Sequence, residues 1–477
     1  MSPDVRARLT AAVKAYDVRG VVGEDLTEDM VRALGAAFVD EVTAAGGLVV
    51  VGHDMRDSSP GFAQAFAEGA ARRGANVSLL GLCSTDETYF ASGVWNAPAA
   101  MFTASHNPAE YNGIKFSRAG AQGISLDSGL AAIRDRALAF LDADSIPAHP
   151  SPGLIDERDV LHDYAAYLRS LVDLRSIRPL RIVVDAGNGM GGLTVPAVLE
   201  TAAGLAPLPI EIIPLFFELD GTFPNHEANP LEPANLVDLQ RAVIDHAADI
   251  GLAFDGDADR CFVVDELGRA VSPSAIAAIV ALREITRVQA QGATDVIVLH
   301  NLITSHIVAE TIREAGATPV RTRVGHSYIK DEMARTSAVF GAEHSAHYYF
   351  REFWGADNGM LAALNVLAEL GAHDAPMSSL RERFTPYAMS GEINSTVTDV
   401  SVATERVRGA FASRASEDSL DGLTMLRTTR STEPFWWFSV RPSNTEPLLR
   451  LNVEAADYDT LNRIRDEVLA LIRKDAP

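Results

Sequence analysis

The chain has 477 residues and a formal net charge of −23 at pH 7, and its two cysteines are Cys83 and Cys261. A chain of this length exceeds what one hydrophobic core serves and predicts several domains. The acidic charge disfavours binding to nucleic acids and anionic membranes, and two cysteines form no disulfide framework. With no apolar stretch of membrane-spanning length and no signal-like N-terminus, we expect a protein of the cytoplasm.

Short apolar runs that end in polar residues or glycine predict buried strands between helices. Residues 29–46 carry apolar side chains at a period of 3.6, and Ser59 followed by Pro60 is typical of the start of a helix, which we expect to run to about Arg73. Strands that alternate with helices of this length favour an α/β architecture with a parallel or mixed sheet. The predicted strands cover residues 48–54, 99–105, 181–185, 249–254 and 295–301.

Three interruptions of this alternation predict domain boundaries. The first is a segment with three prolines at residues 142–153, the second lies near Leu267, and the third falls within residues 373–387. The predicted domains are residues 1–150, 151–267, 268–378 and 379–477. In the last one, two predicted strands, 436–440 and 448–454, flank a polar loop and precede a predicted helix at 458–474. The predicted fold class is three mixed-sheet α/β domains plus a C-terminal α+β domain.

A serine follows directly on one of the predicted strands. Residues 103–108 are Thr-Ala-Ser-His-Asn-Pro, so Ser105 and His106 lie beyond the carboxyl end of the strand, where α/β proteins bind their ligands. Lys115 brings a cation nearby. An ordinary strand-to-loop turn is the alternative, because Ser, Asn and Pro are common there.

Three carboxylates alternate in the loop after another strand. Asp255, Asp257 and Asp259 can converge on one point, where each pair at 4 Å would repel by about 4 kcal/mol at an effective dielectric of 20. A divalent cation with all-oxygen ligation relieves this repulsion, and Mg²⁺ suits a site where a phosphate completes the coordination. An EF-hand is disfavoured because Arg260 takes the position that needs glycine and because both flanks predict strands. A solvated acidic turn is the other alternative.

A second set of polar residues alternates within residues 341–349. If this segment is extended, Glu343, Ser345 and His347 share one face and suit the vicinal hydroxyls of a sugar. An amphipathic edge strand is the alternative. Upstream, His326 and Lys330 could add a titratable group.

Residues 441–447 lie between two predicted strands. Arg441, Ser443, Asn444 and Thr445 offer a guanidinium and several hydrogen-bonding groups, which is the composition of a phosphate cradle. A polar hairpin turn is the alternative.

Residues 187–192 satisfy the spacing G-x-G-x-x-G after a predicted strand. With Glu211 or Glu218 as a ribose partner, this spacing would indicate a dinucleotide-dependent oxidoreductase. A non-catalytic protein that binds a metal or a sugar phosphate is a further alternative, and it would have no use for a reactive serine.

Five segments share their order and composition with one known group of enzymes. They are residues 16–20 (Tyr-Asp-Val-Arg-Gly), 103–108 with 112–115, 255–260, 341–347 and 441–447. Together they resemble the motifs of the α-D-phosphohexomutase family and, more narrowly, its phosphomannomutase/phosphoglucomutase branch. The resemblance implies four domains around a central cleft, with a mobile last domain. It also implies an enzyme that interconverts hexose 1-phosphate and hexose 6-phosphate, of mannose or glucose, through a hexose 1,6-bisphosphate that serves as intermediate and activator.

The resemblance further implies a role for each matching residue. Ser105 would carry the phosphoryl group, and an oxygen of phosphorylated Ser105 would join Asp255, Asp257 and Asp259 in binding Mg²⁺. The remaining roles are charge neutralisation by Arg260, Arg19 and Lys115, proton transfer by His106 or His326, sugar recognition by Glu343, Ser345 and His347, and a phosphate grip by Arg441, Ser443, Asn444 and Thr445.

The sequence departs from the family pattern at a few positions. Ala258 stands where the metal loop often has glycine, and Ala342, His344 and Ala346 alter the sugar loop. These changes leave the reaction class intact and leave the choice between mannose and glucose open. Phosphoglucosamine mutase is a related alternative, but residues 16–20 and His347 argue against it.

Overall fold

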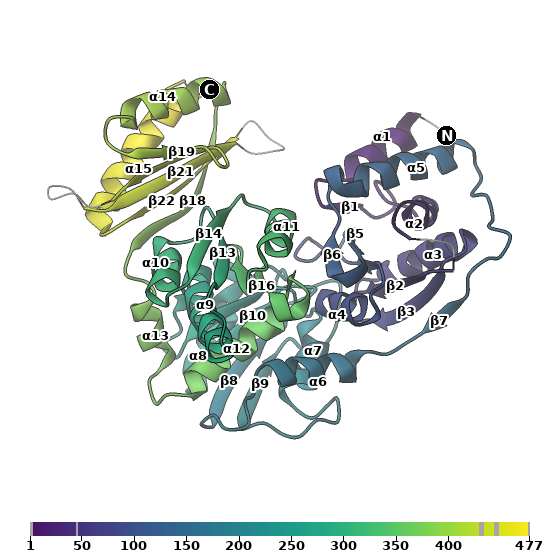
Figure 1. Cartoon of the computed structure of the whole chain (residues 1–477), viewed down its shortest axis with the longest axis horizontal. Coiled ribbons are helices and arrows are strands. Elements are labelled where there is room, and N and C mark those ends of the chain that lie inside the picture. The colour runs from purple at the N-terminus through teal and green to yellow at the C-terminus, as the bar shows by residue number, and fades with distance from the viewer. Residues whose placement is uncertain (1–2, 44–45, 429–433, 443–447, 476–477) are drawn as a thin grey trace.

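A computed structural model describes residues 3–43, 46–428, 434–442 and 448–475 (Figure 1). Its strands form four sheets that follow one another along the chain. The sheets and the helices around them are called the first to fourth domain below. This arrangement confirms the predicted fold class.

The first sheet has the order β1-β5-β4-β2-β3-β7, with β6 paired to β5. Strands β2, β3, β4 and β7 are parallel, whereas β5 runs antiparallel to β1 and β4. Its strands are β1 (Asp17–Val21), β2 (Leu48–His53), β3 (Asn76–Leu82), β4 (Ala99–Phe102), β5 (Tyr111–Arg118), β6 (Gln122–Gly123) and β7 (Ile155–Glu157), and its helices are α1 (Pro3–Ala12), α2 (Glu28–Val42), α3 (Ser59–Arg72), α4 (Thr85–Trp95) and α5 (Ala131–Asp142).

The second and third sheets each combine parallel and antiparallel pairs, in the orders β12-β11-β10-β8-β9 and β14-β13-β15-β16-β17. The second domain contains α6 (Leu161–Leu171), β8 (Leu180–Asp185), α7 (Gly191–Leu199), β9 (Ile210–Leu215), α8 (Val237–Asp245), β10 (Ile250–Phe254), β11 (Cys261–Asp265) and β12 (Ala270–Val271). The third contains α9 (Pro273–Ala290), β13 (Ile297–Asn301), α10 (His306–Glu314), β14 (Thr318–Thr322), α11 (His326–Thr336), β15 (Phe340–Ala342), β16 (Tyr348–Phe350), β17 (Ala356–Asp357), α12 (Gly359–Gly371) and α13 (Met377–Arg383).

The fourth sheet is antiparallel throughout, in the order β18-β22-β21-β20-β19, and helices α14 and α15 pack on it (Figure 1). Its elements are β18 (Ala388–Thr396), α14 (Val400–Phe411), β19 (Ser416–Asp418), β20 (Leu423–Arg427), β21 (Trp436–Pro442), β22 (Leu448–Ala455) and α15 (Tyr458–Ile472). The two strands and the helix predicted for this region are confirmed.

Two features bear on the predicted domain limits. Strand β7 follows residue 150 yet pairs with β3 of the first sheet, and helix α13 spans residue 378. Neither feature marks a boundary between domains. The limits at 150, 267 and 378 therefore stay predictions.

The predicted strand 99–105 is shorter in the structure, where β4 ends at Phe102. The reason is local, because Ser105 has a φ of +49°, outside the β region. The helix expected from Ser59 onward begins at that residue, with Ser58 in the capping position; the Ser59 hydroxyl is directed instead to Asp54.

One hydrophobic core runs through parts of the first three domains, while the first domain also has a second core and the fourth domain has a separate core. The shared core includes an aromatic junction. The Tyr167 ring of the second domain lies 5.6 Å from Phe90 of the first and 5.4 Å from Trp354 of the third, between ring centroids. Trp354 also packs against Gly93 of α4, where a β-carbon would lie 2.2 Å from the indole. These contacts hold the first three domains together as one body.

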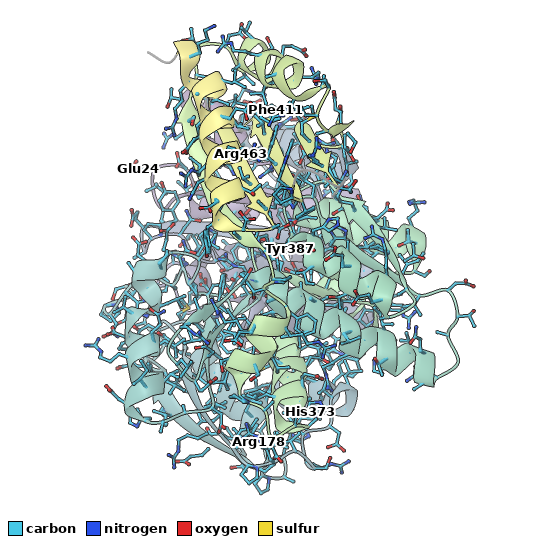
Figure 2. The ribbon with its side chains drawn as sticks, turned by 90° about the vertical axis from the view of Figure 1, so that its left-hand side faces the viewer. Glu24, Arg178, His373, Tyr387, Phe411 and Arg463 are labelled. Atoms are coloured by element: carbon cyan, nitrogen blue, oxygen red, sulfur yellow. The ribbon has the colours of Figure 1, made fainter. Side chains whose placement is uncertain are left out.

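The fourth domain is attached through the third. Glu454 of β22 accepts hydrogen bonds from the Ser305 hydroxyl and, at 2.9 Å, from the main-chain N–H of His306 at the start of α10. Tyr387 lies where the chain enters the fourth domain (Figure 2), and its hydroxyl donates to Glu310 at 2.7 Å. Ring contacts accompany these hydrogen bonds, because the Phe435 ring of the fourth domain lies 4.9 Å from His306, between ring centroids.

Candidate active site

Ser105 lies in a tight loop after β4, and its side chain meets the second domain. Its Oγ donates to Asp255 Oδ2 at 2.7 Å and lies 3.2 Å from His106 Nδ1. Only 3% of the residue is exposed. The loop after one strand therefore holds a hydroxyl directly against the acidic loop, 150 residues further along the chain.

The acidic loop connects β10 and β11, which form an antiparallel hairpin closed by the pair Phe254 and Cys261. Both flanks are strands, so the EF-hand alternative is wrong. Asp255, Asp257 and Asp259 are buried, and one oxygen of each lies within 4.8 Å of the others. Ala258 has a φ of +63°, which explains why glycine is favoured at this position.

Two cations lie against the three carboxylates. Lys115 Nζ lies 2.6 Å from Asp257 Oδ2 and also pairs with Asp259, while Arg260 Nη2 lies 2.8 Å from Asp255 Oδ2. Burial lowers the pKa of Lys115, but the two aspartates outweigh burial and the pKa is raised well above its usual value. Burial raises the pKa of Asp257, yet Lys115 outweighs it and the pKa is lowered.

The acidic loop keeps acceptor capacity that these pairs leave unused. Among the described residues, Oδ1 of Asp257 and Oδ1 of Asp259 are buried and accept no hydrogen bond. A buried carboxylate oxygen without a partner is costly, and a hard divalent cation satisfies it with oxygen ligation. The three residues therefore fit a divalent metal ion.

His106 is held as a neutral imidazole. Burial first, and then the charges of Arg260 and Arg19, lower its pKa to about 2. Its Nδ1 lies 2.7 Å from Arg260 Nη2, and a guanidinium can only donate. Nδ1 is therefore an acceptor, and the ring proton lies on Nε2.

Arg19 of β1 contacts the serine loop at Asn107. Its Nη1 donates to Asn107 Oδ1 and its Nη2 donates to Asp17 Oδ2, both at 2.6 Å. The structure thus brings Arg19 beside the loop of Ser105.

The predicted sugar-binding residues form a turn and not an extended face. Glu343 and His347 close the hairpin between β15 and β16 through a main-chain hydrogen bond of 3.0 Å, and Ala346 has a φ of +66°. The Glu343 carboxylate accepts from the Gly325 N–H at 2.9 Å and from the Tyr349 hydroxyl at 2.7 Å, while Ser345 Oγ lies 2.9 Å from His347 Nδ1.

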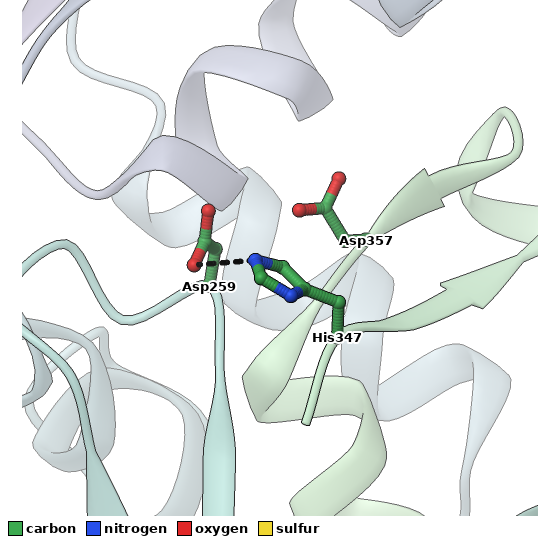
Figure 3. Close-up of side chains that lie close together, drawn as sticks. All are labelled: Asp259, His347 and Asp357. Carbon is green, nitrogen blue, oxygen red and sulfur yellow. Dashed lines mark ion pairs between the residues drawn. The ribbon is translucent and has the colours of Figure 1, made fainter. Parts of the chain in front are cut away.

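The third domain meets the acidic loop at His347 (Figure 3). His347 Nε2 lies 3.9 Å from Asp259 Oδ1, and Asp357 lies close to both. Lys330 of α11 pairs with Asp357 at 2.6 Å and lies 4.1 Å from the centre of the Tyr89 ring. His326 begins α11, but its side chain lies outside the described part of the structure.

The fourth domain contributes Arg441 on β21, which is 7% exposed. Its guanidinium lies 3.4 Å from Glu392 and 3.9 Å from Asp421. Burial lowers the pKa of Arg441, and the charges of Asp421 and Glu392 act against burial. Ser443, Asn444 and Thr445 lie outside the described residues.

Sequence reasoning missed one pair of charged residues. Asp54 and Arg56 follow β2, the parallel neighbour of β4, and both are buried beneath the Ser105 loop. The signal was available, because charged residues just beyond a buried strand lie at the sheet edge where α/β proteins place their sites.

In the glycine-rich turn at residues 187–192, main-chain atoms of other segments occupy the space beside the glycines. A β-carbon at Gly189 would lie 2.6 Å from the carbonyl oxygen of Gly256, and one at Gly192 would lie 2.1 Å from that of Phe217. Glu211, one suggested ribose partner, pairs with Arg181 at 3.0 Å. The glycines serve close packing behind the acidic loop, which gives the dinucleotide alternative no support.

Comparison with known proteins shows the family to which this fold belongs. The phosphoglucomutase/phosphomannomutase models match all four domains, the three α/β/α domains at residues 10–138, 162–268 and 272–387 and the C-terminal domain at 392–471. The chain is 39% identical to a phosphohexose mutase of Xanthomonas campestris pv. campestris, over 97% of this chain and 99% of the relative. It is 36% identical to a phosphomannomutase of Escherichia coli, over 96% and 98%.

A solved phosphoglucomutase/phosphomannomutase family protein of Burkholderia thailandensis superposes with a TM-score of 0.85 at 28% identity, covering 100% of this chain and 98% of that one. The four-domain fold with a serine on a buried carboxylate loop defines an enzyme of the phosphohexomutase type. More narrowly, the chain belongs to the phosphoglucomutase/phosphomannomutase family. Within the part of the chain that the structure describes, no helix has the length and apolar character needed to cross a membrane.

Proposed function

We propose that this enzyme interconverts hexose 1-phosphate and hexose 6-phosphate, of mannose or glucose, and that Ser105 carries the phosphoryl group in between. The observation that carries the proposal is the 2.7 Å contact of Ser105 Oγ with Asp255, at the edge of three converging carboxylates. A serine hydroxyl is a poor nucleophile in water, so a fixed position beside a cation site is what phosphoryl transfer requires.

We assign Mg²⁺ to Asp255, Asp257 and Asp259, with an oxygen of phosphorylated Ser105 as a further ligand. Bound there, the ion would neutralise charge on the transferring phosphoryl group. The support is the all-oxygen donor set and the two buried oxygens of Asp257 and Asp259 that accept no hydrogen bond among the described residues.

The chain's own residues prepare the serine for both directions of transfer. The Ser105 hydroxyl donates to Asp255, so the proton that leaves when serine accepts a phosphoryl group has an acceptor in place. Arg260 Nη2 lies 3.5 Å from Ser105 Oγ and adds a positive charge where negative charge develops. His106 accepts from Arg260 and orients it, and Lys115 adds a second cation over the acidic loop.

The substrate is assigned to the remaining motif residues. Glu343, Ser345 and His347 would hold the sugar hydroxyls, while Arg441, Ser443, Asn444 and Thr445 would grip the phosphate that is not reacting. A hexose 1,6-bisphosphate formed at Ser105 must turn around and return its other phosphoryl group. A grip that binds phosphate rather than one face of the ring serves both orientations.

Charge and thiol chemistry favour a cytoplasmic enzyme that acts on a small anion. The net charge of −23 opposes nucleic acids and anionic membranes, whereas Lys115, Arg260 and Arg441 concentrate positive charge at the site. Both cysteines are buried free thiols.

The test is a mutase assay on mannose 1-phosphate and glucose 1-phosphate, with Mg²⁺ and a trace of hexose 1,6-bisphosphate. Ser105→Ala should abolish turnover, and mass spectrometry after incubation with the bisphosphate should find a phosphate on wild-type Ser105 only. Ser170→Ala, an exposed serine on α6, is the control and should behave as wild type. A wild-type chain that binds the sugar phosphate but never interconverts it would indicate the binding-protein alternative.

A further inference from the structure

The loop that carries Ser105 is held from beneath by Arg56. The Arg56 side chain is 1% exposed, and its two terminal nitrogens donate to four main-chain carbonyls of that loop. Nη2 donates to the carbonyls of Ser105 (2.9 Å) and Asn107 (2.7 Å), and Nη1 donates to those of Pro108 (2.7 Å) and Tyr111 (3.0 Å). One planar fork therefore sets the path of residues 105–111.

The loop needs such support because its backbone is strained at the reactive residue. Ser105 has a φ of +49°, in the left-handed region that residues other than glycine avoid. On its other side, the Ser105 carbonyl faces Gly256, where a β-carbon would lie only 2.4 Å from the oxygen. The carbonyl is thus confined between Arg56 and the acidic loop, and this confinement directs Oγ at Asp255.

Arg56 is itself fixed by two domains. In the first domain, Asp54 Oδ2 lies 3.3 Å from Arg56 Nε, and Asp54 Oδ1 accepts from the Arg56 N–H and from Ser59 Oγ. In the second domain, the Phe223 ring lies 5.1 Å from the guanidinium, and Gly221 approaches so closely that a β-carbon would lie 2.7 Å from Arg56 Cα. The guanidinium is therefore a rigid template.

We propose that Arg56 is a positioning residue for phosphoryl transfer. It holds Ser105 in its strained conformation and keeps Ser105 Oγ on the Asp255 carboxylate. Because it also fixes the carbonyl of Asn107, it presents the Asn107 side chain to Arg19. The inference rests on the proposed function of Ser105. Lysine cannot replace Arg56, since one ammonium offers three donors from a single point and cannot span four carbonyls.

Arg169 is a matched control within the same chain. Its guanidinium also donates to three main-chain carbonyls, those of Val198, Glu200 and Ala206, but it holds a loop of the second domain that carries none of the candidate site residues. Arg56→Lys and Arg169→Lys therefore remove the same kind of clamp, one at the serine and one away from it.

The expected result separates positioning from stability. A misplacement of about 1 Å costs on the order of 100-fold in rate, so Arg56→Lys should lower kcat about 100-fold while KM stays near the wild-type value, because the sugar and phosphate grips lie on other domains. Arg169→Lys should leave both constants unchanged even if it lowers the unfolding midpoint equally. Phe223→Leu, which removes the ring beside the guanidinium and keeps the hydrogen bonds, should give a smaller loss of kcat than Arg56→Lys.

Hydrogen exchange supplies a readout that does not depend on mutase activity. Peptides that cover residues 103–112 should lose protection in Arg56→Lys and keep it in Arg169→Lys. Wild-type kcat in Arg56→Lys, an equal loss of kcat in Arg169→Lys, or unchanged protection in both would overturn the inference. If the wild-type enzyme lacks mutase activity while Arg56→Lys still loses protection at residues 103–112, the proposed function fails and the role of Arg56 in shaping the loop stands.

Discussion

At the scale of single residues, the charges around Ser105 show why a phosphate there would need a divalent ion beside it. The three aspartates face two cations, Lys115 and Arg260, which leaves one net negative charge. A divalent ion changes this to one net positive charge, which offsets part of the charge of about −2 on a phosphoserine. On the proposed mechanism, a divalent ion would therefore change the site from one that repels the phosphate of Ser105 to one that attracts it.

Asp257→Asn tests this balance at constant size. The amide removes one carboxylate and the ion pair with Lys115, so we expect the Mg²⁺ concentration for half-maximal activity to rise by about 10- to 100-fold or more. A Mg²⁺ titration of the mutase rate measures it. Asp265→Asn, at the far end of the same hairpin, should titrate as wild type. An unchanged titration in Asp257→Asn would remove the residue from the metal site.

Gly256→Ala tests the close approach of the two loops. The new β-carbon would lie 2.4 Å from the carbonyl oxygen of Ser105, so the serine loop and the acidic loop must shift apart. We expect kcat to fall about 100-fold with little change in KM. Gly409→Ala in α14 is the control, because nothing lies within 4 Å of its new β-carbon. A wild-type kcat in Gly256→Ala would show that the two loops can move apart without loss of catalysis.

At the scale of elements, helix α4 links the first domain to the acidic loop. Ser84 and Glu87 form a capping box at its start, and the Thr85 hydroxyl donates to Asp257 Oδ2 at 2.6 Å. The positive end of the helix dipole therefore points toward a carboxylate of the second domain. The same helix carries Phe90 and Gly93 of the aromatic junction, so its position affects both the core and the site.

The capping carboxyl of α4 should make stability depend on pH. Burial raises the pKa of Glu87 from 4.5 to about 7, a difference worth about 3 kcal/mol. Because the folded pKa is the higher one, the stability that this group contributes is complete below pH 4.5 and is lost as the pH rises through 7. Glu87→Gln, which still accepts from the Ser84 N–H, should unfold as wild type does near pH 4 and be the more stable protein at pH 8.

Denaturant unfolding at both pH values measures this difference. Glu68→Gln, an exposed carboxylate on α3, is the control and should follow the wild-type profile throughout. Parallel pH profiles of Glu87→Gln and wild type would contradict the shifted pKa.

The elements themselves were largely predictable from local patterns. The strands at β2, β8, β10 and β13 and the helices α2 and α3 match the predicted stretches within a few residues, because apolar periodicity reports which face is buried. The stretch around Glu343 and His347 was not predictable as a turn. Alternating polar residues fit a strand face equally well, and only the left-handed φ of Ala346 closes the hairpin.

At the scale of the whole molecule, the fourth domain stands apart because its hydrophobic core is separate from the cores of the other three domains. It has its own core, and Glu454 joins it to the third domain as the carboxylate acceptor for the start of α10. Trp437 of the fourth domain also donates to Glu454. Since Arg441 lies on the neighbouring strand β21, this junction positions the residue that we propose binds the phosphate.

Glu454→Gln should loosen that junction. The amide replaces one acceptor oxygen with a donor that faces the Ser305 or His306 donors, and a lost hydrogen bond to a charged group costs about 1.5–3 kcal/mol. We expect KM for the hexose phosphate to rise about tenfold or more, with Ser105 still phosphorylated by the bisphosphate. Steady-state kinetics and peptide mass spectrometry give the two readouts. Asp457→Asn, which keeps a capping residue within the fourth domain, should leave KM unchanged.

By itself, the sequence determined the order of strands and helices, the residue types at each motif and, through their resemblance to known motifs, the family of the enzyme. Local propensity and short-range spacing suffice for these, because they involve residues close together in the chain. Only the tertiary structure decided which charges meet. Lys115 reaches Asp257 across 142 residues, and Arg56 holds the carbonyl of Ser105 across 49. The first pair depends on how two sheets pack together and the second on which strands become neighbours within one sheet, and no local pattern encodes either.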